Sequence, residues 1–158
     1  MTSRADCSGA RLRVLLLAST ALIFSSLGAK AQTWTGNTSP DWFDGTNWVP
    51  GTVPVGGEQP IIDTTTPNAP VIDGGVSPTA PAAGLFPQIF IGNSATGMLT
   101  IQNGGTLNAD NAFIGSDAGS NGTVTMTGAS VWNSTNTSNG IVVGFNGTGT
   151  FKIGRAHV

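Results

Sequence analysis

Three stretches of the chain repeat one pattern: Phe90-Ile-Gly…Gly97-Met-Leu-Thr-Ile101, Phe113-Ile-Gly…Gly122-Thr-Val-Thr-Met126 and Val142-Val-Gly…Gly149-Thr-Phe-Lys-Ile153. The glycines before the alternating segment lie at positions 97, 122 and 149, so the spacing is 25 and then 27 residues. Self-similarity at such a period is typical of proteins built from stacked repeats. The sequence therefore predicts a stack in which equivalent residues of successive copies lie above one another.

Within each copy, apolar and polar residues alternate with a period of two, which indicates β-strands with one buried face. We expect the apolar set to be buried, namely Leu99, Ile101, Val124, Met126 and Phe151, with Ile153 on the same side. Thr100 and Thr125 are expected to face outward. Short strands are expected at 89–91, 99–101 and 106–108.

These features predict an all-β protein, a right-handed parallel β-helix (solenoid) of about three rungs with an N-terminal Trp/Pro-rich capping segment. The alternative is an antiparallel β-sandwich. Asn-Gly pairs such as Asn103-Gly104 and Asn121-Gly122 separate the strands, and such pairs also form hairpin turns.

The first 31 residues have the features of a signal peptide. Three arginines, the last of them Arg13, precede an apolar run from Val14 to Leu27. Ala29-Lys30-Ala31 supplies a small-x-small cleavage pattern, which makes Gln32 the expected first residue after cleavage. The apolar run is too short and too interrupted by Ser and Thr for a transmembrane helix. We therefore expect export by the Sec pathway.

Residues 32–84 hold eight of the nine prolines and three of the four tryptophans, Trp34, Trp42 and Trp48. These indole rings, together with the ring of Phe43, could stack on sugar faces if they are exposed. We favour the other interpretation, in which these residues cap the open N-terminal end of the stack, because a first rung leaves strand edges and apolar surface uncovered. The expected organisation is a signal peptide at 1–31, a Trp/Pro-rich N-terminal cap region at 32–84 and β-helix repeats at 85–152.

The last six residues, 153–158, are expected to be foreign to the protein. With a following stop codon, Ile153-Gly-Arg-Ala-His-Val158 can be back-translated as ATCGGAAGAGCACACGTCTGA, which resembles a common sequencing adapter. On this interpretation the sequence is a fragment, and no functional role is expected for His157, the only histidine.

The composition excludes several classes of protein. Only 9% of residues are charged, and from Gln32 onward seven acidic side chains stand against two basic ones, a formal charge of −5. This balance provides no cationic surface for nucleic acid. The single cysteine, Cys7, lies in the expected signal peptide, so disulfide and thiol chemistry are not expected.

The remaining residues offer few candidates for catalysis or metal binding. No Gly-x-Ser-x-Gly motif occurs, and without a usable His or Cys we expect no Ser-His or Cys-His nucleophile and no zinc site. Asp110 and Asp117 could act as a carboxylate pair for calcium or glycoside chemistry, but we favour solvated turn residues. The expected catalytic, cofactor-binding and metal-binding residues are therefore none, and no cofactor is expected.

The repeats at 96–107, 113–133 and 142–151 resemble the β-helical repeat shared by autotransporter (type V secretion) passengers and PEP-CTERM-associated exported proteins. Residues 33–54, with the motif Asp41-Trp-Phe-Asp-Gly-Thr-Asn-Trp48, resemble the segment that often follows the signal peptide in those proteins. The resemblance implies the N-terminal fragment of a passenger, with the outer-membrane β-barrel of the same chain beyond this sequence as its partner.

The resemblance implies a non-catalytic, structural or adhesive role at the cell surface or outer membrane of a Gram-negative bacterium, or in the medium. The expected ligand is a host or cell-surface glycan or protein. Two alternatives remain: a fragment of a secreted β-helical polysaccharide-active enzyme, and a PEP-CTERM exported matrix protein.

Overall fold

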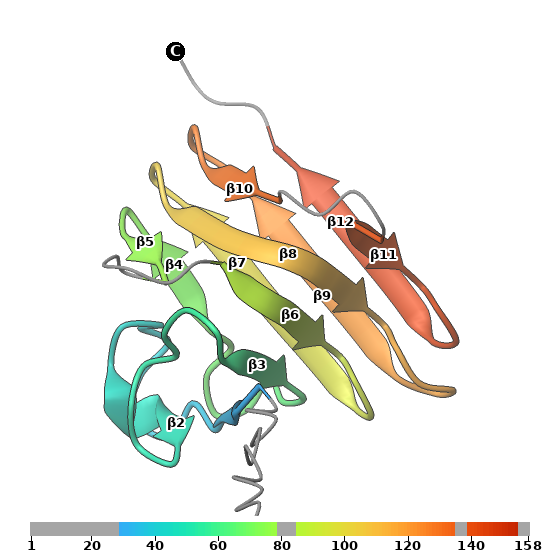
Figure 1. Cartoon of the computed structure of the whole chain (residues 1–158), viewed down its shortest axis with the longest axis horizontal. Coiled ribbons are helices and arrows are strands. Elements are labelled where there is room, and N and C mark those ends of the chain that lie inside the picture. The colour runs from blue at the N-terminus through green and yellow to red at the C-terminus, as the bar shows by residue number, and fades with distance from the viewer. Residues whose placement is uncertain (1–28, 79–84, 135–138, 155–158) are drawn as a thin grey trace, which may run out of the picture.

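The computed structural model describes residues 29–78, 85–134 and 139–154. Within these ranges nearly all regular structure is β-strand, and the strands stack in parallel (Figure 1). The chain forms a right-handed parallel β-helix of about four turns. This confirms the predicted fold class, with one turn more than the three repeats visible in the sequence.

Each turn of the β-helix has up to three sides. The first side contains β1 (Ala31–Trp34), β3 (Gln59–Ile62), β6 (Phe86–Ile91), residues 109–114 of β8 (Thr106–Ile114) and β11 (Ile141–Val143). The second side contains β4 (Val71–Asp73), β7 (Thr96–Gln102), β9 (Asn121–Met126) and β12 (Thr148–Ile153). The third side contains β5 (Val76–Ser77), residues 106–108 of β8 and β10 (Val131–Asn133). The long strand β8 thus belongs to two sides.

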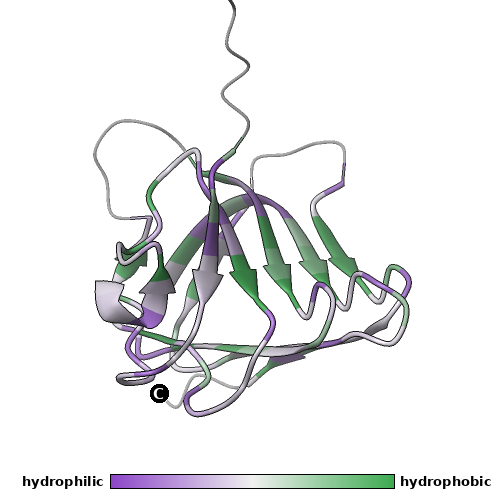
Figure 2. Ribbon diagram, turned by 90° about the horizontal axis from the view of Figure 1, so that it is seen from below, coloured by the Kyte–Doolittle hydropathy of each residue, from purple (hydrophilic) through white to green (hydrophobic). Residues whose placement is uncertain are grey.

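The second side has the register that the alternation predicts. Leu99 of β7 pairs with Val124 of β9, which pairs with Phe151 of β12. Leu99, Ile101, Val124 and Met126 are buried, as predicted. The intervening Thr100 and Thr125 lie on the outer face. On the first side, apolar segments at the ends of neighbouring strands lie side by side in Figure 2.

The prediction was wrong for the last described turn. Phe151 is only half-buried and Ile153 is 77% exposed, although both continue the inner columns of the stack. Their exposure arises because no described turn lies over β12. Ile153 also pairs with Met126, so β12 extends one residue into the expected foreign tail.

The glycine before each alternating segment is required by a close approach of the backbone. A Cβ atom on Gly122 would collide with the carbonyl oxygen of Ile91, one turn earlier. Gly97 and Gly149 meet the carbonyl oxygens of Ile62 and Ile114 in the same way. Any larger residue would therefore push two turns apart at this corner, which explains why the repeat is most regular there.

The N-terminal segment caps the first turn. β2 (Trp48–Val49) pairs with β1 in antiparallel orientation and so covers an edge that would otherwise be open. It follows the 3₁₀ helix η1 (Gly45–Asn47), whose N-terminus is capped by the side chain of Asp44.

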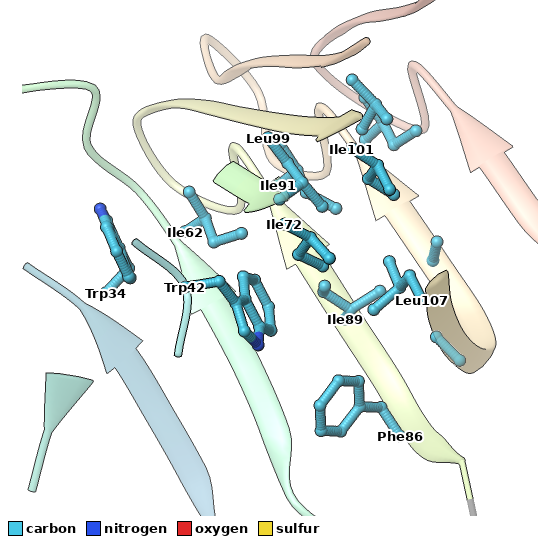
Figure 3. Close-up of a cluster of buried hydrophobic side chains, with 14 of the residues drawn as sticks. Trp34, Trp42, Ile62, Ile72, Phe86, Ile89, Ile91, Leu99, Ile101 and Leu107 are labelled. Carbon is cyan, nitrogen blue, oxygen red and sulfur yellow. The ribbon is translucent and has the colours of Figure 1, made fainter. Parts of the chain in front are cut away.

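The indole rings of this cap lie inside the molecule. Trp34, Trp42 and Trp48 are at most 2% exposed, and Trp34 and Trp42 lie at one end of the aliphatic core in Figure 3. The indole N–H of Trp34 donates to the carbonyl oxygen of Asn68 (2.8 Å), and that of Trp48 donates to the carbonyl oxygen of Trp42 (2.9 Å). Rings enclosed in this way cannot stack on a sugar, so the capping interpretation holds for these three tryptophans.

The stack begins earlier than the sequence repeat. The apolar runs at 60–62 and 70–72 form β3 and β4, which pair in parallel with β6 and β7 of the next turn. Ile62 and Ile72 are fully buried. Residues of the expected cap region therefore supply a complete turn of the β-helix.

Part of the sequence-based organisation falls outside the described residues. These residues are 1–28 of the expected signal peptide, including Cys7, and 155–158 of the expected foreign tail, including His157. Among the residues that the structure does describe, no helix is long and apolar enough to cross a membrane.

Candidate functional site

A groove of about 490 Å³ lies on the outer face of the second side, at its N-terminal end. We call it the Asp73 groove. Its lining residues come from the cap, from β4 and from β7: Pro40, Asp41, Phe43, Val71, Asp73 and Gln102. The volume is within the range of about 300–1,000 Å³ that is usual for small-molecule sites.

Strand register brings these distant residues together. Asp41 forms a parallel bridge with Val71, and Asp73 pairs with Gln102 of the next turn. Ile72 points into the core, so its neighbours Val71 and Asp73 point outward. The groove is thus built from the cap and two successive turns, and it exists only when the stack is formed.

The carboxylate of Asp73 is held by two neutral amides. Its Oδ1 accepts a hydrogen bond from Asn103 Nδ2 (2.7 Å), and its Oδ2 accepts one from Gln102 Nε2 (3.2 Å). A carboxylate has about four acceptor positions, so two remain for a ligand. These contacts fix the orientation of the carboxylate without neutralising its charge.

The ring of Phe43 is positioned by a glycine. A Cβ atom on Gly75 would collide with the ring carbons Cε2 and Cζ of Phe43, so the ring lies directly against the Gly75 backbone. Phe43 also packs against the buried core and is half-buried. It therefore provides a firmly seated apolar surface in the groove.

Asp41 adds a second carboxylate to the groove. Its Oδ1 accepts a hydrogen bond from the backbone N–H of Phe43 (2.9 Å). This contact ties the acid and the ring into one short turn. The groove thus combines a ring, two carboxylates and the amide of Gln102, which together can accept and donate hydrogen bonds beside an apolar surface.

Polar columns continue from the groove along the second side. Thr100 follows Val71 in register and is followed by Thr125 and Lys152. In a second outward column, Met98 is followed by Thr123 and Thr150. Neighbouring strands lie about 4.8 Å apart, so hydroxyl groups recur at this interval along the stack.

The structure does not bring Asp110 and Asp117 together as a carboxylate pair. Asp110 lies near the start of the part of β8 on the first side, and Asp117 lies beyond the end of β8 at Ile114. The four steps along the strand from residue 110 to residue 114 alone span about 13 Å. Asp110 is half-buried and Asp117 is exposed, and the described residues contain no group of three His, Cys, Asp or Glu side chains that could hold a metal ion.

A second surface feature is a ladder of phenylalanines on the outer face of the first side. Phe90 and Phe113 stack with ring centroids 5.2 Å apart and an angle of 14° between the rings, and Phe145 meets Phe113 edge-on at 6.1 Å. Rings that stack on one another turn their edges outward rather than their faces. The ladder is thus a less suitable platform for a planar ligand than the ring of Phe43.

Sequence reasoning missed the groove. Asp41, Phe43 and Asp73 lie outside the recognisable repeats, and Gln102 lies at the end of one. The motif around Asp41 suggested its aromatic residues, Phe43 included, as possible sugar contacts, but it gave no sign of the carboxylates that lie beside them. The one usable signal was the recurrence of apolar runs at 60–62 and 70–72, which would have placed Asp73 beside Gln102.

Comparison of the chain with protein-family models, with curated proteins and with solved structures gave no match. The fold by itself places the chain in the class of parallel β-solenoid proteins.

Proposed function

We propose that this chain is a non-catalytic, surface-displayed segment of an autotransporter-type passenger, with a structural or adhesive role at the surface of a Gram-negative bacterium. The observation that carries the proposal is the parallel β-helix with columns on its outer face in which threonines recur, Thr100 and Thr125 in one and Thr123 and Thr150 in the other. Such columns offer many equivalent contacts along one direction, which suits adhesion to an extended surface.

The sequence features noted above support the same proposal. The pattern in residues 1–31 is that of a Sec signal peptide, and the repeats resemble those of passenger domains. A solenoid also suits export, because each turn contacts mainly its neighbours and can fold as it is added to the stack. The outer-membrane barrel of the complete chain would then be the anchor.

Surface labelling of intact cells tests the proposed location. An epitope inserted at residues 117–119, which are exposed, should be accessible to antibody and to added protease without lysis when the complete gene is expressed. Cells carrying the gene should also adhere better to glycan- or protein-coated surfaces than cells from which it is deleted. An epitope that becomes accessible only after lysis would refute the proposal.

The Asp73 groove favours one alternative, a polysaccharide-active enzyme, because Asp41 and Asp73 place two carboxylates at one site. Glycoside hydrolases use two such groups as acid and base or nucleophile. The purified chain should release no reducing ends from neutral or acidic polysaccharides. Release that is lost in both Asp41→Asn and Asp73→Asn would overturn the non-catalytic role.

A further inference from the structure

We propose that the Asp73 groove binds a hexose unit of a neutral polysaccharide, with Phe43 beneath the sugar ring and Asp73 and Gln102 at its hydroxyl groups. This inference rests on the proposed adhesive function, because it names the ligand class that the surface would recognise. Of the aromatic residues in the cap, it retains sugar stacking for Phe43, which is half-buried, and excludes it for the three buried tryptophans.

The first argument is the combination of groups. A sugar ring presents apolar C–H groups on its faces and hydroxyl groups around its edge, so its site needs a flat apolar surface beside hydrogen-bond acceptors. Phe43 supplies the surface, and Asp73 supplies an acceptor whose orientation two amides already fix. Hydrogen bonds from a hydroxyl to a carboxylate are short and stronger than neutral ones.

The second argument is the preorganisation of the ring. Phe43 lies against Gly75, where a side chain would displace it, and the backbone N–H of Phe43 is tied to Asp41. A side chain held in one place loses little entropy when a ligand binds. The three atoms nearest to a Cβ at position 75 all belong to the ring of Phe43, so glycine at this position gives the ring room.

The third argument concerns the length of the ligand. Outward columns run from the groove along the stack, with Thr100 and Thr125 in register with Val71 of the groove. Their hydroxyl groups can donate to and accept from further sugar units. The direction of these columns favours a linear polysaccharide over a single monosaccharide.

The test uses the purified full chain with cello-, laminari-, malto- and manno-hexaose as probes. Binding is measured by calorimetry and by saturation-transfer NMR. At least one probe should bind, and Phe43→Ala and Asp73→Asn should each weaken binding of that probe about tenfold or more, the equivalent of 1.4 kcal/mol. Gly75→Ala should have a similar effect, because it retains the phenylalanine but displaces its ring.

Matched controls separate loss of the site from loss of the fold. Phe145→Ala removes a 62% exposed phenylalanine, and Asp117→Asn neutralises an exposed aspartate; neither residue lines the groove. Both variants should bind like the original chain. Thermal unfolding should show that Gly75→Ala remains folded, because the atoms it displaces are at the end of one side chain.

The possible results distinguish this inference from the proposed function. Failure of all four hexasaccharides to bind, or equal binding by Phe43→Ala and the original chain, would overturn the inference while leaving surface display intact. Glycan binding that depends on Phe43, in a protein whose epitope is inaccessible on intact cells, would support the groove and refute the surface location.

Discussion

Val124 is the position at which one substitution should test the register of the stack most severely. It is fully buried in β9, between Leu99 on one neighbouring strand and Phe151 on the other. In Val124→Asp, loss of the buried valine costs about 1.5–3 kcal/mol. A buried carboxyl group without a hydrogen-bond partner costs about 1–3 kcal/mol more.

The charge adds a third contribution. Burial raises the pKa of the new carboxyl group above its unfolded value, and keeping the group protonated at pH 7 costs about 4 kcal/mol, at about 1.4 kcal/mol for each unit. The sum is about 7–10 kcal/mol, compared with a total stability of about 5–15 kcal/mol for a typical domain. Val124→Asp should therefore be largely unfolded at neutral pH.

The sign of the pH dependence follows from the raised pKa. The unfolded chain releases its proton at lower pH than the folded chain, so the destabilisation is greatest at neutral pH and decreases as the pH falls toward the unfolded pKa. Val124→Asp should thus regain structure near pH 4. Val124→Asn, which does not titrate, should be destabilised without this dependence.

Thr125→Asp is the matched control, one residue away on the outer face. Its neighbours in register are Thr100 and Lys152, so the new carboxylate meets solvent and a cation and should cost less than about 1 kcal/mol. Urea unfolding followed by far-ultraviolet circular dichroism at pH 7 and pH 4 measures the stability of all of these variants. Equal destabilisation by Val124→Asp and Thr125→Asp would refute the assigned register.

Three further predictions follow from local geometry. Urea unfolding should show that Gly115→Ala destabilises the protein by more than about 2 kcal/mol and Gly119→Ala by about 1–2 kcal/mol. Both glycines have positive φ angles, +76° and +83°, but only at Gly115 would the added methyl group collide with backbone atoms. Equal losses of stability would contradict the close approach at Gly115. Hydrogen bonds from Thr46 hold the pKa of Asp44 below its ordinary value, so their contribution to stability is present at neutral pH and is lost as the pH falls through the lowered pKa. A ¹³C NMR titration of Thr46→Ala should show a higher pKa for this carboxyl group. An unchanged pKa would disprove the assigned cause. Acrylamide should quench the fluorescence of the half-buried Trp132 but hardly that of the three tryptophans of the cap. In Trp132→Phe, quenching should therefore be almost completely lost. Strong residual quenching in this variant would show that the cap is open.

The sequence was sufficient to predict the fold because the stack requires particular residues at particular corners. Gly97, Gly122 and Gly149 face backbone carbonyls of the preceding turn, and no other residue fits there. The alternation that follows each glycine then identifies the inner face. Leu99 and Val124 could be recognised as core residues for this reason alone.

The first complete turn could not be recognised in the same way. Its strands β3 and β4 are four and three residues long, and the connections near them are rich in proline rather than in the repeat glycines. The groove was even harder to predict from the sequence. Phe43 becomes a binding surface only because Gly75, which is 32 positions further along the sequence, lies against its ring, and no local pattern reports such a contact.

The strands of this molecule keep a fixed register along its sides, whereas the number of residues between successive strands varies. Ile61, Phe90, Phe113 and Val142 lie in register on the first side, although 29, 23 and 29 positions separate them in the sequence. The corners absorb these differences, so length can change there while the ladders keep their alignment. A peptide grafted at such a corner would be presented at a fixed height on a rigid rod, and grafts on successive turns would be spaced at intervals set by the backbone alone.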